Sequence, residues 1–356
     1  MAAVWAMVMK EFQELRRDRR TMAMLVVLPL LLLVVFGYAA NFTVDSIPTD
    51  VYGPQAQQVA DGLKDPFDVR TVDAGGDRQD AESAVQDNKA DVAIVTASSG
   101  EPTALVDGSS LFSAQSAVSA FNRLGGQVKV DVLYNPELKT SWVMIPALAG
   151  LILTFIGIIV TSLGLVRERQ EGTLEQLAVM PFRPFDVIAG KITPYFLFAA
   201  LDMVLVTVLG IILFDVPFNG SVFVFGVGAI LFLLVLLGLG GLISSVSQNA
   251  GQAIQSAMFV MLPSIMFSGM IFPLAAMPWS VRWIGYVLPL TYFINIAQGV
   301  MLRGAAFTAL WLSFVVLAVY AVVVFSAAML RLRRDLAPNV KDRPREEDPA
   351  EKLVAA

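Results

Sequence analysis

Six long apolar runs separated by polar segments form the pattern of hydrophobic and polar positions along this chain. Each run is long enough to cross about 30 Å of hydrocarbon at ~1.5 Å per helical residue. The runs lie at residues 22–40, 142–166, 192–213, 221–246, 253–271 and 305–330. The pattern predicts an α-helical membrane protein with six transmembrane helices, the first within 21–40 and the other five within 142–332.

Residues 1–20 predict an interfacial helix in front of the first span. Apolar positions recur at helical spacing, opposite charged ones: Trp5, Val8, Phe12 and Leu15 against Lys10, Glu11, Glu14 and Arg17. Such a helix suits the headgroup boundary, although packing on a soluble partner gives the same pattern. The basic residues place this end in the cytoplasm by the positive-inside rule. A signal peptide is the competing interpretation of 22–40, but its charged leader is too long.

Residues 41–141, between the first two spans, alternate short β-type runs with helical ones. We expect strands at 49–52, 67–72, 91–96, 103–106 and 128–134, and helices at 56–63, 80–88 and 111–124. This order predicts a small extracytoplasmic α/β domain, with a mixed sheet covered by helices on one face. Acidic residues outnumber Lys and Arg about two to one here, which keeps the domain soluble. The run 106–109 fits either a carboxylate and hydroxyl site or a turn, and we favour a turn.

Composition narrows the chemistry available to the chain. Of its 356 residues 15% are charged, against about 25% in soluble domains, and the mean hydropathy is +0.68. Cys and His are absent, which excludes thiol and imidazole catalysis, disulfides and the usual zinc and haem ligand sets. We therefore expect no catalytic residue and no metal site. No basic stripe with interleaved aromatic residues occurs, so nucleic-acid binding is disfavoured.

Two features inside the spans concern packing and charge. Gly150, Gly157 and Gly164 recur every seven residues, so they share one helix face with a drift of about 20° per repeat. Such a face lets another helix approach closely, and we expect a packing seam that could join two subunits.

Asp202 lies near the middle of the third span. An acid there costs about 2.5–3.5 kcal/mol and should face protein or water, either as a hydrogen-bond anchor, which we favour, or as a proton or cation site.

Prolines and aromatic residues cluster between the fifth and sixth spans. Within 272–292 the prolines interrupt helices while the surroundings stay apolar, so we expect short re-entrant or interfacial helices at the outer surface. The sixth span ends in an arginine cluster, which marks a cytoplasmic end. The tail at 333–356 is Pro-rich and charged, and we expect it to be disordered. Six spans place both termini in the cytoplasm.

The polar segment between the second and third spans carries the clearest functional signal. Leu174 and Leu177 share a face of a predicted helix whose acidic residues remain available to water or a partner. Pro181 and Pro184 then prevent a regular helix, and the chain turns back toward the bilayer. Taken alone, the segment could be a solvated loop between two helices.

The run RERQEGTLEQL at 167–177, followed by Met180-Pro181 and Gly190-Lys191, resembles the signature of ABC-2 type transporter permeases, the membrane subunits of ATP-driven exporters. The branch it resembles carries a large extracytoplasmic domain after the first span. The resemblance implies that residues 167–180 form the cytoplasmic coupling helix that docks on an ATP-binding subunit. The implied docking residues are Glu168, Glu171, Gly172, Thr173, Glu175 and Leu177.

The resemblance implies an exporter subunit that moves a hydrophobic or amphipathic compound, such as a drug, antibiotic or lipid, out of the cytoplasm or inner leaflet. No Gly-x-x-x-x-Gly-Lys-Ser/Thr phosphate loop occurs in the chain. We therefore expect no enzyme activity and no cofactor bound by this chain, with ATP and Mg on a partner subunit. The expected partners are a cytosolic ATP-binding subunit, a second permease in a homodimer or heterodimer, and the lipid of a prokaryotic inner or plasma membrane.

Two other functions fit parts of the pattern. A proton-coupled secondary transporter would use Asp202, but it predicts an internal repeat and broken helices near the midplane, and neither is evident. A membrane-anchored receptor or assembly factor would use the extracytoplasmic domain. That function leaves the segment at 167–180 unexplained.

Overall fold

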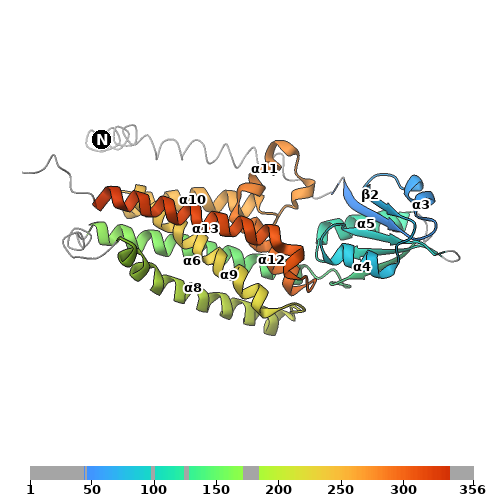
Figure 1. Ribbon diagram of the computed structural model, residues 1–356, viewed down its shortest axis with the longest axis horizontal. Coiled ribbons are helices and arrows are strands. Elements are labelled where there is room, and N and C mark those ends of the chain that lie inside the picture. Colours follow the sequence, from blue (N-terminus) through green and yellow to red (C-terminus); the bar gives the residue numbers. More distant parts are fainter. Residues whose placement is uncertain (1–43, 45, 98–100, 124–127, 171–183, 337–356) are drawn as a thin grey trace, which may run out of the picture.

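The computed structural model describes residues 44, 46–97, 101–123, 128–170 and 184–336. An α/β domain lies at one end of an elongated helical bundle (Figure 1). The predicted interfacial helix at 1–20 and the first span at 21–40 lie outside the described residues, as does the tail from 337 onward. The last described helix ends at Leu336, inside the range expected for the tail.

Five strands of the described domain form one sheet in the order β2-β1-β3-β4-β5. Neighbouring strands are parallel except for β3 and β4, so the sheet is mixed, as predicted. The elements are β1 (Ile47–Tyr52), α3 (Ala56–Gly62), β2 (Phe67–Asp73), α4 (Arg78–Gln86), β3 (Val92–Val95), β4 (Thr103–Asp107), α5 (Leu111–Arg123) and β5 (Lys129–Leu133). Each lies close to the range expected from its local pattern.

The prediction that helices cover one face of the sheet is wrong, because both faces are covered. Helices α3 and α5 contribute to one apolar cluster, through residues such as Ala56 and Phe121. Helix α4 packs Ala81 and Val85 against the opposite face. The strand order explains the difference. Parallel crossovers are right-handed, so β1-α3-β2 and β2-α4-β3, which run in opposite directions across the sheet, place their helices on opposite faces.

Burial on both faces also explains the composition of the central strands. Strand β3 reads Val-Ala-Ile-Val without the alternation of a half-exposed strand, and Val92, Ala93 and Ile94 are fully buried.

Helix α4 begins at a capping box. The Asp77 side chain accepts a hydrogen bond from the Asp80 backbone N–H, and the Asp80 side chain accepts one from the Asp77 backbone N–H. These reciprocal bonds satisfy N–H groups that the first helical turn leaves free.

Five of the described helices are long and apolar enough to cross a membrane, so the chain is a multi-pass membrane protein. They correspond to the second to sixth predicted spans. Their bounds are α6 (Thr140–Gln170), α8 (Pro184–Phe214), α9 (Val222–Val246), α10 (Ala250–Phe267) and α13 (Phe307–Leu336).

A broken helical segment connects α10 to α13. It consists of the 3-10 turn η1 (Leu274–Ala276), α11 (Trp279–Val287) and α12 (Pro289–Met301). Helices α11 and α12 meet at 79°. Pro289 at the start of α12 has no N–H to continue α11. Trp279, Trp283 and Tyr286 on α11 are exposed, whereas most of α12 is buried in the bundle.

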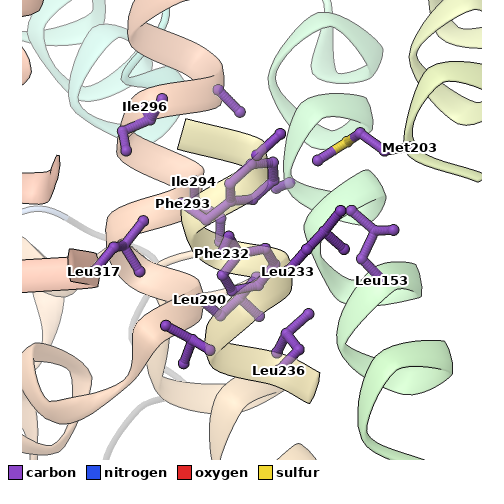
Figure 2. Packing of buried hydrophobic residues seen from close by; sticks show 14 of the residues in the cluster. Leu153, Met203, Phe232, Leu233, Leu236, Leu290, Phe293, Ile294, Ile296 and Leu317 are labelled. Carbon is purple, nitrogen blue, oxygen red and sulfur yellow. The ribbon is translucent and has the colours of Figure 1, made fainter. Parts of the chain in front are cut away.

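The centre of the bundle is a close-packed apolar cluster built from α6, α9, α12 and α13 (Figure 2). Phe232 of α9 stacks on Phe293 of α12, with ring centroids 4.4 Å apart and planes 9° from parallel. Leu153, Leu236 and Leu317 lie around this pair (Figure 2). Lipid tails are as apolar as these side chains, so close packing rather than the hydrophobic effect holds the helices together.

Candidate functional site

The three glycines of α6 lie where neighbouring helices of the same chain come closest. A Cβ atom added to Gly150 would lie 2.6 Å from Phe293 Cδ1, and one added to Gly157 would lie 2.9 Å from Leu236 Cβ. A Cβ on Gly164 would overlap the hydroxyl of Tyr195. Counted from the end of α6 next to the α/β domain, the glycines therefore face α12, α9 and α8 in turn.

The predicted coupling segment is bracketed by α6 and α8. Helix α6 continues to Gln170, beyond its apolar part, and α8 starts at Pro184. Glu168 lies in the last turn of α6. The other proposed docking residues lie outside the described residues: Glu171, Gly172, Thr173, Glu175 and Leu177. Their role stays a prediction.

Helix α6 is a continuous connection between the α/β domain and this segment. It contains 31 residues, which corresponds to about 46 Å at ~1.5 Å per residue. At the end of the helix next to the domain, Asn135 Oδ1 accepts from the Lys139 backbone N–H at 2.8 Å, and Asn135 Nδ2 donates to the Gly108 carbonyl at 3.2 Å. Asn135 is fully buried. The helix is thus tied to the domain at one end and leads into the predicted coupling segment at the other.

Asp202 lies on α8, next to the face that packs on the bundle. Ala199 and Met203 on that face are buried, whereas Asp202 itself is only partly buried. Asp202 forms no hydrogen bond or ion pair with another described residue. The anchor and the proton-site interpretations both stay open.

A buried polar cluster joins the α/β domain to the bundle. Arg303, in the connection from α12 to α13, places Nη1 3.6 Å from Asp107 Oδ2 and donates from Nη1 to Ser109 Oγ at 3.0 Å. The Ser109 hydroxyl donates to Asp107 Oδ1 at 2.6 Å. The side chains of Arg303 and Asp107 are 4% and 0% exposed. We call Asp107, Ser109 and Arg303 the polar junction.

Hydrogen bonds extend the polar junction into the bundle. Arg303 Nη2 donates to Asn295 Oδ1 on α12 at 3.3 Å, and Asn295 Nδ2 donates to Ser313 Oγ on α13 at 2.9 Å. From the domain side, Gln86 Nε2 at the end of α4 donates to the Arg303 carbonyl at 3.1 Å. The contacts therefore run from α4 and β4 to α12 and α13.

Asp91 brings a second carboxyl group to the polar junction. It precedes β3 and is joined to β4 by the Asp107 backbone N–H, which donates to the Asp91 carbonyl at 2.8 Å. Burial of its carboxyl group, followed by the charge of Asp107, raises the pKa of Asp91 to about 6. Hydrogen bonds from Ser113 and Ser110 and the charge of Arg303 act in the opposite direction. Asp91 is thus a group that takes up a proton under mildly acidic conditions.

Sequence reasoning missed Arg303, and at 106–109 it favoured a turn over a site built on the Asp107 carboxylate and the Ser109 hydroxyl. The turn exists, because Asp107 Oδ1 also accepts from the Ser109 backbone N–H at 2.8 Å. The same side chain, however, meets Arg303. A signal was present in the sequence: Arg303 is the only charged residue between 283 and 330. An isolated charge beside apolar spans needs a partner when it is buried.

Comparison with known proteins identifies the family. The sequence model described as ABC-2 family transporter protein matches residues 19–330. The probable multidrug ABC transporter permease YbhR of Escherichia coli K12 is 28% identical over 93% of this chain and 98% of its own length. The corresponding values for the probable multidrug ABC transporter permease YbhS of the same organism are 29%, 94% and 97%. The inner membrane transport permease YhhJ of Escherichia coli K12 is 32% identical over 57% of this chain and 54% of its own. Since the family match spans most of the chain, including the five apolar helices, this chain belongs to the ABC-2 family of transporters and is an ABC transporter permease.

Proposed function

We propose that this chain is the membrane subunit of an ABC exporter, driven by a separate ATP-binding subunit, with both of its termini in the cytoplasm. The observation that carries the proposal is the course of α6. This helix runs unbroken from the α/β domain to Gln170, where the predicted coupling segment continues, and its glycines pack closely on three other helices. A displacement of the coupling segment would therefore move packed helices as rigid elements.

The proposed substrate is a hydrophobic or amphipathic compound, such as a drug, antibiotic or lipid. YbhR and YbhS are named as probable multidrug permeases, which supports a substrate of this class. In the five apolar spans, Asp202 is the only charged residue. A strongly charged substrate would need more countercharges than one carboxylate, because an unpaired charge is costly within a membrane.

The proposed partners are a cytosolic ATP-binding subunit, which would hold ATP and Mg, and a second permease. Helix α8 exposes an apolar surface that suits lipid or that second subunit. Its large exposed side chains include Leu197, Phe198, Leu201, Ile212 and Leu213.

Charge reversal at the predicted coupling segment tests the proposal. We expect Glu171→Lys to abolish both co-purification of an ATP-binding protein, measured by mass spectrometry after mild-detergent affinity purification, and drug efflux. The control is Glu101→Lys, which makes the same charge change at an exposed position of the α/β domain. We expect this control to retain the partner and the transport.

Other results would count against the proposal. Unchanged transport in Glu171→Lys at normal expression would remove the coupling role of the segment. Recovery of the unmodified chain without any ATPase activity under several gentle conditions would favour the receptor or the secondary-transporter function instead.

A further inference from the structure

The connection between α12 and α13 is bonded from several sides. Beyond the polar junction, Asn219, which lies before α9, donates from Nδ2 to the Leu302 carbonyl at 2.7 Å and from its backbone N–H to the Met301 carbonyl at 3.0 Å. Gly304 adopts φ +63°. This left-handed conformation suits glycine and turns the chain into α13 with the Arg303 side chain directed at the domain.

Close packing leaves little freedom to the Arg303 side chain. A Cβ atom on Gly299 of α12 would lie 3.2 Å from Arg303 Nη2 and 2.9 Å from Leu310 Cδ2. On the other side, a Cβ on Gly108 would lie 2.7 Å from the Leu133 carbonyl oxygen. Gly299 thus makes room for the guanidinium, and Gly108 lets the turn that receives it pack closely on the end of β5.

We propose that the polar junction fixes the α/β domain to the outer ends of α12 and α13, so that the domain and these helices move as one rigid body. Asn135 ties the same turn, at Gly108, to the start of α6. The domain therefore holds the outer ends of α6, α12 and α13 together. That these helices move during transport rests on the proposed function, whereas the rigid attachment does not.

Burial of the ion pair is the physical reason for the attachment. Because the side chains of Arg303 and Asp107 are out of water, a displacement too small to admit water would leave each charge buried without its partner, which is far more costly than opening an exposed pair. A conformational change of the bundle can carry both groups together at little cost. It cannot withdraw α12 and α13 from the domain without rehydrating both charges.

A second contact between the bundle and the α/β domain is apolar. Ala275 and Ala276 of η1 pack against the apolar cluster of the domain that includes α3 and α5. The polar junction and this apolar contact lie on different elements, so together they restrict rotation of the domain as well as its separation from the bundle.

Spin-label distances in the full-length protein test the proposal. The chain contains no cysteine, so Gln58→Cys on α3 and Thr308→Cys on α13, both at exposed positions, supply the only labelling sites. Double electron–electron resonance on the purified chain in nanodiscs needs no ATP-binding subunit. We expect one narrow distance population in the parent, and a second population or a clear broadening in Arg303→Met combined with Asp107→Asn.

The double variant leaves no unpaired buried charge, so it remains testable even if Arg303→Met alone does not fold. Arg303→Lys should restore a narrower distribution, because it keeps the charge. The matched control is Arg78→Met, which removes an exposed ion pair with Asp131 inside the domain and should leave the distances unchanged. A broad distribution in the parent, or an unchanged one in the double variant, would overturn the proposal whatever the chain transports.

Discussion

Stability should depend on pH through Asp91 in a direction opposite to that of most carboxyl groups. The structure raises its pKa from the ordinary 3.8 to about 6. Between these values the folded chain keeps a proton on Asp91 that the unfolded chain has released, so this group makes the fold less stable as the pH rises from about 4 to about 6. The difference corresponds to at most about 3 kcal/mol, and to less where water reaches the partly exposed residue.

Asp91→Asn isolates this contribution, because an amide of the same shape still accepts the serine hydrogen bonds but carries no charge. We expect the variant to melt above the parent at pH 7.5, by at most about 6 °C at ~2 °C per kcal/mol for a large chain, and at the same temperature as the parent near pH 4. The assay is differential scanning fluorimetry of the purified full-length protein over this range. Asp131→Asn, at an exposed ion pair, is the control and should shift little at any pH. An Asp91→Asn shift that does not vary with pH would refute the reasoning.

Three further predictions concern the bundle. We expect Gly157→Ala to destabilise the fold by about 1–3 kcal/mol, because its Cβ would meet Leu236, and Gly226→Ala, where nothing lies within 4 Å, to be neutral or stabilising in the same detergent melting assay. We expect Phe293→Ala to cost about 3–5 kcal/mol and to lower the yield of folded protein in size-exclusion chromatography, because the ring is fully buried against Phe232. If Asp202 is a hydrogen-bond anchor, Asp202→Asn retains transport at every pH, because an amide can replace the carboxyl group in that role, whereas a pH-dependent loss of efflux would assign a proton role to Asp202.

The local pattern of apolar and polar residues was sufficient to predict the helices and strands, but not how they are arranged in space. Alternating and helical periodicities predicted the strands and helices of the α/β domain to within a few residues. The order of the strands could not be predicted from the sequence, because it depends on pairing between distant segments. The position of α4 on the second face follows from that order and from the right-handed crossovers. The bend between α11 and α12 was expected from its prolines, whereas burial of α12 in the bundle was not.

The polar junction shows why the site was only partly predictable. Arg303 and Ser109 are 194 positions apart in the sequence, and neither lies in a motif that names the other. Sequence reasoning can notice that Arg303 is isolated among apolar residues, but it cannot say which carboxylate meets it. The coupling segment is the reverse case. Its signature can be recognised in a short stretch of sequence, but residues 171–183 lie outside the described structure, so its contacts stay a prediction.

Two kinds of contact stabilise this chain: close packing between helices where lipid is the solvent, and a buried ion pair where water is. Among the membrane-spanning helices, lipid offers no hydrophobic driving force, so the contacts depend on glycines such as Gly150 and on stacked rings such as Phe293. Where the bundle meets the α/β domain, an ion pair such as Arg303–Asp107 can form, because the alternative for its charges is hydration rather than exposure to hydrocarbon. Substitutions in α6 should therefore reduce the amount of folded bundle. Substitutions at the polar junction should leave the bundle folded and change where the α/β domain lies on it. Arg303→Met combined with Asp107→Asn leaves no unpaired charge, so a loss of folded bundle in this double variant without any change in domain position would place the junction in the first group.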